Sequence, residues 1–240
     1  MPSEWKFPGP VPKEALEFFR KKGLTPSFSW ADVWSEEHQV SFTVAKILEI
    51  DVLATVRGSL ERALEDGQTF EQWRKDINGV LDKSGWSAYQ TGTKKGDLRR
   101  LRTIFDTNMR TARATGQHER VQRTKRVLPY LRYEVGPARK HTDTCLSWSG
   151  TILPVDDPWW EDHWPPNHYL CTGHVIQIGE REVDRRGGVT DVPPSYDVEW
   201  KLPDGTSTRS PVGVHPSFRA VGRSRTDGLD DALRIAEKRK

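Results

Sequence analysis

The residues that are best suited to catalysis or metal binding lie between Gly136 and Gly173. This stretch holds both cysteines, Cys145 and Cys171, with three of the seven histidines and four of the ten tryptophans. Its histidines are His141, His163 and His168, and His174 follows directly. Histidine titrates near neutral pH and thiolates are strong nucleophiles, and both bind metals. A catalytic or metal site in this chain is therefore expected here.

A metal-dependent nuclease of the His-Asn-His kind is one interpretation of Asn167, His168 and His174. Such a site uses one histidine as general base on a strand, and others, here His141 or His163, to hold a divalent metal beside the scissile phosphate. Nearby carboxylates are able to add oxygen ligands, namely Asp156, Asp157, Glu161 and Asp162. However, these carboxylates lie in a Pro/Trp-rich loop whose spacing does not form a strand–turn–helix metal finger. The nuclease is therefore the alternative function.

Other enzyme signatures are missing from the sequence. It contains no phosphate-binding GxxxxGK[ST] loop and no GxSxG elbow. We therefore predict that the chain is not an enzyme.

The prolines and tryptophans of the same stretch have a structural interpretation. Pro158-Trp159-Trp160 and Trp164-Pro165-Pro166 combine residues that fix the backbone with residues that bury a large area. No charged pattern around them indicates an aromatic cage for a cation. We expect these tryptophans, with Trp148, to form the core of an irregular loop module.

Composition is typical of a soluble globular protein, with 30% charged and 35% hydrophobic residues. No run of eighteen apolar residues occurs, so no membrane span is expected. The first residues lack the basic-then-apolar order of a secretory signal, so the product should stay in the cytoplasm in which it is made. Two cysteines in such a chain do not indicate a disulfide scaffold.

Positive charge is concentrated between Lys94 and Arg126, where eleven Lys and Arg face three acidic residues. This segment suits DNA phosphates, an acidic protein surface or plain solvent. A helix-turn-helix regulator would have no use for the Pro/Trp stretch, so contacts to phosphates or to protein are favoured over base reading. The candidate contact residues are Arg99, Arg100, Arg102, Arg110, Arg113, Arg120 and Arg123.

Periodicity predicts that the first part of the chain is helical. Residues 12–22 form a short helix, and residues 36–66 form a long one whose apolar face includes Val44, Leu48, Val52, Val56 and Leu60. Thr69 with Gln72 resembles the cap of a third helix. A basic helix covers 97–126, and its small residues Ala112, Ala114 and Gly116 permit close approach of another element.

After Pro129 the pattern changes to strands and loops. Alternation predicts strands at 130–135, 175–178 and 196–200. Residues from 185 onward are rich in Gly, Pro, Asp and Ser, and end in a polar helix near 228–239. We therefore predict an α+β fold with a helical region at 1–126, a β/loop-rich module at 127–184 and an extended C-terminal arm at 185–240.

Three ordered blocks resemble the phage Mu F-like head-morphogenesis family. The first runs from EALEFFRKKG to TFEQWR, the second from LRRLRTIFDTNMR to LRYEVGP, and the third is HTDTCLSWSGTILPVDDPWWEDHWPPNHYLCTGHV. Together they cover about residues 12–180. The PVDDPWW and HWPPNHYLC strings are similar to that family's signature.

This resemblance implies a minor head protein of a tailed bacteriophage. Such proteins are expected inside the capsid near the portal, in few copies, with a role in head assembly or genome packaging. The implied partners are portal, capsid and scaffold proteins, with packaged double-stranded DNA as a further partner and no membrane. The implied location is the virion, and the host cytoplasm during assembly.

The chain departs from the family pattern at its histidines and cysteines. The family usually has His at Cys145 and a Cys-x-Cys pair where this chain has Cys171-Thr172-Gly173, with His174 next. That pattern resembles a structural metal site, and zinc accepts thiolate and imidazole interchangeably. The resemblance thus implies a zinc set of Cys145, Cys171, His174 and His141, with His163 as an alternative fourth ligand. The competing interpretation is that the cysteines are buried small apolar residues and that His163 or His168 only hydrogen-bonds a loop.

The expected strand pairing gives a geometric test of this set. If strand 175–178 returns beside strand 130–135, Cys145 and Cys171 approach each other in one loop module, together with His174. Two ligands of one zinc lie well within about 8 Å of each other.

Overall fold

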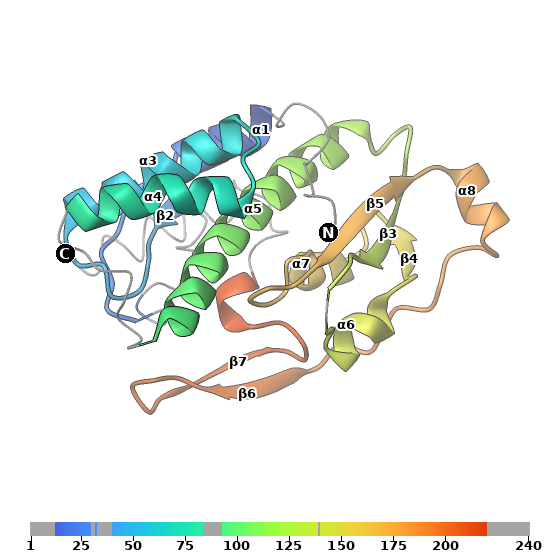
Figure 1. The fold of residues 1–240 in the computed structure, drawn as a ribbon. Helices are drawn as coiled ribbons and strands as arrows, with labels where there is room; N and C mark the ends of the chain where they lie inside the picture. The colour runs from blue at the N-terminus through green and yellow to red at the C-terminus, as the bar shows by residue number, and fades with distance from the viewer. Residues whose placement is uncertain (1–12, 30–31, 33–39, 84–92, 139, 220–240) are drawn as a thin grey trace.

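A computed structural model describes residues 13–29, 32, 40–83, 93–138 and 140–219. The fold class is α+β, as predicted: a group of helices adjoins a module built on a small sheet (Figure 1). The elements of the helical region are α1 (Lys13–Arg20), β1 (Gly23–Leu24), β2 (Ser41–Phe42), α3 (Ile50–Glu65), α4 (Phe70–Lys83) and α5 (Lys94–Thr124).

Helix α5 is the longest of the described elements, and it packs on both the helical region and the sheet module. Its N-cap is Thr93, whose side chain accepts a hydrogen bond from the backbone N–H of Gly96 at 3.1 Å. Leu101 and Met109 are buried among the helices, whereas Val121 is buried in the core of the module. The predicted helix 97–126 is therefore confirmed with slightly earlier ends.

Helix α1 crosses α5 at very short range. The crossing point is Gly116, where an added Cβ would lie 2.7 Å from the backbone nitrogen of Ala15. Ala15 is fully buried, and an ion pair between Glu14 and Arg123 lies beside it. The prediction that the small residues of this helix permit close approach is confirmed.

The other helices enclose an apolar core that contains a buried hydrogen bond between two side chains. The Trp73 indole donates to the hydroxyl of Ser59 at 3.0 Å, so its N–H is satisfied inside the core. The predicted cap of α4 is present as a reciprocal pair: Gln72 N–H donates to Thr69 Oγ1 at 3.3 Å, and Thr69 N–H donates to Gln72 Oε1 at 2.8 Å.

The predicted long helix 36–66 is wrong over residues 41–49, which are not helical. Residues 33–39 lie outside the described residues, and α3 begins only at Ile50. Before it, β2 pairs in parallel with β1, and Ser27 forms a bridge with Ile47. Lys46 has a φ of 65°, which no helix accommodates. Pairing with β1 has overridden the helical periodicity.

This correction changes the environment of one predicted core residue. Val44, Val52, Val56 and Leu60 are buried as predicted, but Leu48 is 60% exposed. We expect Val52→Asp to lower the free energy of unfolding by about 3–5 kcal/mol, the usual range for an unpaired buried charge. Leu48→Asp should stay within about 0.5 kcal/mol, as surface substitutions do. Urea unfolding of both variants measures the difference, and equal losses would contradict the break before α3.

The module is built on a three-stranded antiparallel sheet in the order β4-β3-β5. β3 (Tyr130–Val135) pairs with β4 (Ile152–Pro154) and with β5 (Gly173–Ile178). The predicted strands 130–135 and 175–178, and their antiparallel pairing, are confirmed. Three short helices, not predicted, complete the module: α6 (Asp143–Trp148), α7 (Trp159–His163) and α8 (Glu180–Arg185).

The described portion of the C-terminal segment, which ends at residue 219, packs on the module. β6 (Asp197–Lys201) and β7 (Ser207–Pro211) form a hairpin, followed by the short 3-10 helix η2 (Pro216–Phe218). Val214 and Phe218 are buried in the module core. The expected strand at 196–200 is thus present, whereas the expected helix at 228–239 lies outside the described residues. In the described part of the chain, no helix is both long and apolar enough to cross a membrane.

Candidate metal centre

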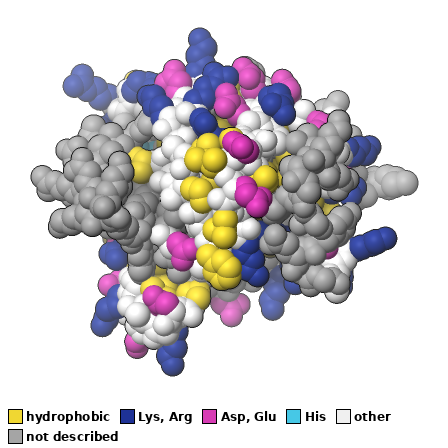
Figure 2. Space-filling view, turned by 90° about the vertical axis from the view of Figure 1, so that its left-hand side faces the viewer, with side chains coloured by type: hydrophobic (Ala, Val, Ile, Leu, Met, Phe, Trp, Pro, Cys, Tyr) yellow, Lys and Arg dark blue, Asp and Glu magenta, His cyan; other side chains and the backbone are white. Residues whose placement is uncertain are grey.

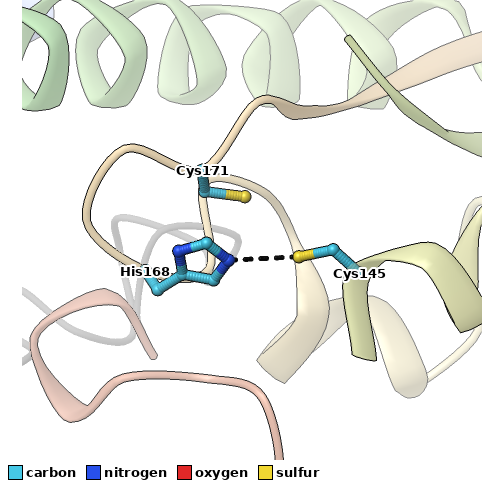
Figure 3. Close-up of side chains that lie close together, drawn as sticks. All are labelled: Cys145, His168 and Cys171. Atoms are coloured by element: carbon cyan, nitrogen blue, oxygen red, sulfur yellow. Dashed lines mark hydrogen bonds between the residues drawn. The ribbon is translucent and has the colours of Figure 1, made fainter. Parts of the chain in front are cut away.

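Three side chains with metal-binding atoms converge in the module. The Sγ atoms of Cys145 and Cys171 and a ring nitrogen of His168 all lie within 4.8 Å of one another. Figure 3 shows them pointing into the same small space from two different segments. Both cysteines are buried and His168 is half-buried. The predicted approach of Cys145 and Cys171 is confirmed.

Local backbone structure fixes each of these side chains. Cys145 lies in the first turn of α6, and its N–H donates to the capping hydroxyl of Thr142 at 3.2 Å. His168 and Cys171 bracket a tight turn in which the Cys171 N–H donates to the His168 carbonyl at 3.1 Å. Within this turn Leu170 has a φ of 61°, a conformation that side chains other than glycine rarely adopt. The turn therefore holds both ligand residues on one side.

The imidazole of His168 is oriented as in metal-binding histidines. Its Nδ1 lies 2.9 Å from the backbone carbonyl of Tyr169, and its Nε2 lies 3.1 Å from Cys145 Sγ. Because a carbonyl oxygen only accepts, Nδ1 carries a proton. In the neutral ring this leaves the lone pair on Nε2, directed at the sulfurs. Such a hydrogen bond on the far nitrogen is what fixes the tautomer of metal-ligating histidines.

The two thiols are electrostatically unequal. The pKa of Cys171 is lowered, chiefly because the Cys145 thiol donates a hydrogen bond to it, and the pKa of Cys145 is raised by the same interaction and by burial. The Gly173 N–H also donates to Cys171 Sγ at 3.3 Å. The pKa of His168 is raised by its interaction with Cys171. The site is thus arranged to hold a thiolate beside an imidazole.

The other histidines of the predicted zinc set lie outside this cluster. His174 is exposed on β5, since side chains alternate along a strand and its neighbour Val175 points into the core. His141 Nδ1 lies 3.4 Å from Thr172 Oγ1. His163 is stacked on Trp159, with ring centroids 4.3 Å apart, and its Nδ1 contacts the Trp159 carbonyl. The structure groups His168 with the two cysteines in their place.

Geometry gives no support to the His-Asn-His arrangement. Asn167 is fully buried and its amide contacts the Tyr133 hydroxyl, so it does not face solvent. His168 points at a sulfur, and His174 lies on the outer side of β5. In the described part of the chain, no carboxylate joins the cluster.

The tryptophans form the core on which this site is built. Trp148, Trp159, Trp160 and Trp164 are each at most 5% exposed, as the structural interpretation predicted. Their rings meet edge to face, for example at 5.7 Å between the centroids of Trp148 and Trp159.

Several of the predicted contact arginines make internal contacts. Arg100 donates to the carbonyl of Ala45, Arg110 to that of Cys171, and Arg123 pairs with Glu14. Arg102 pairs with Asp106 and lies over the Phe70 ring, and burial lowers the pKa of Arg113 to about 10. Arg99 and Arg120 are exposed.

Comparison with known protein families identifies the family to which this sequence is similar. Residues 54–176, which include α5, the sheet and all three cluster residues, match the family described as "Phage Mu protein F like protein". The chain belongs to the phage Mu F-like family.

Two relatives are similar to this Mu F-like chain over most of its length. The "Putative capsid assembly protein F" of Escherichia phage Mu is 33% identical over 73% of the chain, and the Mu-like prophage FluMu F protein of Haemophilus influenzae is 30% identical over 67%. The matched parts are 42% and 40% of those proteins, so the chain spans about two fifths of their length. No solved structure matches.

Proposed function

We propose that this chain is a minor head protein of a tailed bacteriophage that acts in head morphogenesis, inside the capsid and near the portal. The observation that carries the proposal is its similarity, over 73% of its residues, to a protein named for capsid assembly. Its partners are the portal protein and capsid or scaffold proteins, and its location is the virion, with the host cytoplasm as the place of assembly.

An exposed apolar surface on the helical region supports docking to such a partner. The large hydrophobic side chains that are exposed in the described part of the helical region are Phe28, Leu48, Ile50 and Leu98. Figure 2 views the molecule from the side that lies on the left in Figure 1, where hydrophobic side chains form a stripe with acidic ones beside it. Clustered apolar surface is typical of protein interfaces.

Analysis of purified heads tests the proposal. Mass spectrometry with copy counting should find the chain in few copies per head, both in empty and in DNA-filled heads. Particles assembled without it should be aberrant or unable to package DNA. Normal heads that lack the chain entirely would contradict the proposal.

We further propose that exposed arginines of α5 contact packaged DNA through its phosphates. Arg99 and Arg120 are the exposed members of the predicted set for which the described residues provide no ion pair. Contacts to phosphates release counterions, so affinity falls steeply with salt.

A gel-shift titration at low and moderate salt measures this contact. Double substitution of Arg99 and Arg120 to Gln should lower affinity and reduce the slope of log K against log salt by about 2, since each phosphate contact contributes about 0.9. Arg102→Gln is the matched control, because Arg102 is already paired with Asp106. If the wild-type chain does not bind DNA at low salt, these arginines serve protein contacts instead.

We propose that the cofactor is one structural zinc held by Cys145, His168 and Cys171. The donor set fits: two cysteine sulfurs and one imidazole are ligands that zinc prefers, and the Nδ1 contact with the Tyr169 carbonyl leaves Nε2 as the nitrogen that faces the sulfurs. A bound zinc would supply a cross-link between α6 and the turn before β5. Metal analysis of the purified chain should find one zinc per chain.

A further inference from the structure

The hydroxyl of Tyr133 lies at the edge of the metal cluster. Tyr133 is fully buried on β3, and its oxygen is 3.9 Å from Cys145 Sγ. Its ring is held by Trp148 and Trp159, with centroid distances of 5.9 and 6.3 Å. These ring contacts hold the phenol beside Cys145 Sγ.

Asn167 fixes the direction of this hydroxyl. With its amide oriented to satisfy every group, Asn167 donates to the carbonyls of His163 and Trp164, each at 3.3 Å, and accepts from the Tyr133 hydroxyl at 3.1 Å. In this orientation the phenol proton is directed at Asn167 at 3.1 Å rather than at Cys145 Sγ, the longer contact at 3.9 Å. The oxygen keeps its lone pairs for another contact.

Gly173 leaves the space that the hydroxyl occupies. A Cβ at this position would overlap the Tyr133 hydroxyl. The Gly173 N–H donates to Cys171 Sγ at 3.3 Å, so the glycine that borders the hydroxyl also borders the cluster. The side chain of Tyr133 thus fills the place that a residue 173 side chain would take beside the cluster.

We propose that the Tyr133 hydroxyl oxygen is the fourth ligand of the metal held by Cys145, His168 and Cys171. This inference rests on the proposed zinc site. In a tetrahedral site with metal–sulfur and metal–oxygen bonds of about 2.3 and 2.1 Å, a sulfur and an oxygen are separated by about 3.6 Å. The observed 3.9 Å is close to that edge length.

A fourth protein ligand makes the site closed. Structural zinc sites have four protein ligands, whereas catalytic sites keep a position for water. Among the His, Cys, Asp and Glu of the described residues, three belong to the cluster, so the fourth position decides between these classes. With Tyr133 bound, an external anion has no position to take.

Azide binding to the Co²⁺-loaded chain tests the inference. Tetrahedral Co²⁺ has visible absorption bands that change when a ligand is exchanged. The wild-type chain should bind one Co²⁺, and its spectrum should stay unchanged up to millimolar azide. Tyr133→Phe should still bind Co²⁺, about 10- to 100-fold more weakly, and its bands should shift on addition of azide. Tyr130→Phe, on the same strand, should behave like the wild type.

The outcomes separate this inference from the zinc proposal. A wild-type chain that takes up no Co²⁺ or Zn²⁺ contradicts the zinc site itself. A wild-type chain that binds Co²⁺ and responds to azide has water in the fourth position, which overturns the role of Tyr133 alone. If Tyr133→Phe does not fold, the wild-type titration still decides, and Gly173→Ala, which pushes the hydroxyl away, should produce the azide response.

Discussion

Removal of the metal by a strong chelator should lower the melting temperature of the purified chain by about 8–16 °C. A ligand present at a thousand times its dissociation constant stabilises the folded state by about 4 kcal/mol. In a chain of this size, a loss of 1 kcal/mol in the free energy of unfolding lowers the melting temperature by about 2–4 °C. The effect follows because the proposed zinc would join α6 to the turn before β5, two segments that in the described residues meet around the cluster. Thermal unfolding followed by circular dichroism, with zinc added back, measures it.

Histidine variants distinguish the proposed ligand set, which contains His168, from the set predicted from sequence, which contains His174 and His141. His168→Ala should already melt at the lower temperature and should not respond to chelator. His174→Ala and His141→Ala should keep the full chelator response, because neither side chain is part of the cluster. If the wild type melts at the same temperature with and without chelator, the thiols are simply buried small residues.

The cysteines of this site were predictable from sequence, but the histidine was not. His174 is adjacent to Cys171 in the chain, yet the alternation of β5 turns it to the outer side. The spacing that did carry information is His168-x-x-Cys171, a tight turn that places both ends on one side. Adjacency is thus a poorer guide to a metal site than a spacing that closes a turn.

Helices and strands were predictable where local pattern and long-range pairing agree. The strand predicted at 130–135 and the helix cap predicted at Thr69 agree with the structure because their long-range contacts favour the same local structure as their sequence pattern. Within the helix predicted at 36–66, residues 41–49 are not helical because residues 41, 42 and 47 pair with residues 23, 24 and 27, and such long-range pairing cannot be inferred from the local sequence. For the same reason, the basic segment could not be resolved into internal and exposed arginines.

Substitution of Gly116 by Leu should destabilise the chain by about 3 kcal/mol, at the upper end of the usual cost of overpacking. The reason is that the added side chain meets the backbone of α1, not the flexible end of a side chain: the nearest atoms are N and Cα of Ala15, at 2.7 and 3.0 Å from the added Cβ. Helix α1 must move away from α5, which exposes Phe18 and Phe19, both 1% exposed in the intact fold. Urea unfolding should show a lower midpoint, and a loss of 3 kcal/mol would lower the melting temperature by about 6–12 °C.

Gly79→Leu is the matched control for this substitution. Gly79 also lies inside a helix, α4, but among the described residues nothing beyond the adjoining backbone of that helix and the two neighbouring residues lies within 4 Å of a Cβ added there. The exchange of a helical glycine for leucine then has only its intrinsic effect, a gain of up to about 1 kcal/mol in helix propensity. The same change should therefore have opposite signs at the two positions. If Gly116→Leu is as stable as Gly79→Leu, α1 does not pack on α5 in solution, and Phe18 and Phe19 belong to a surface that is free to meet a partner.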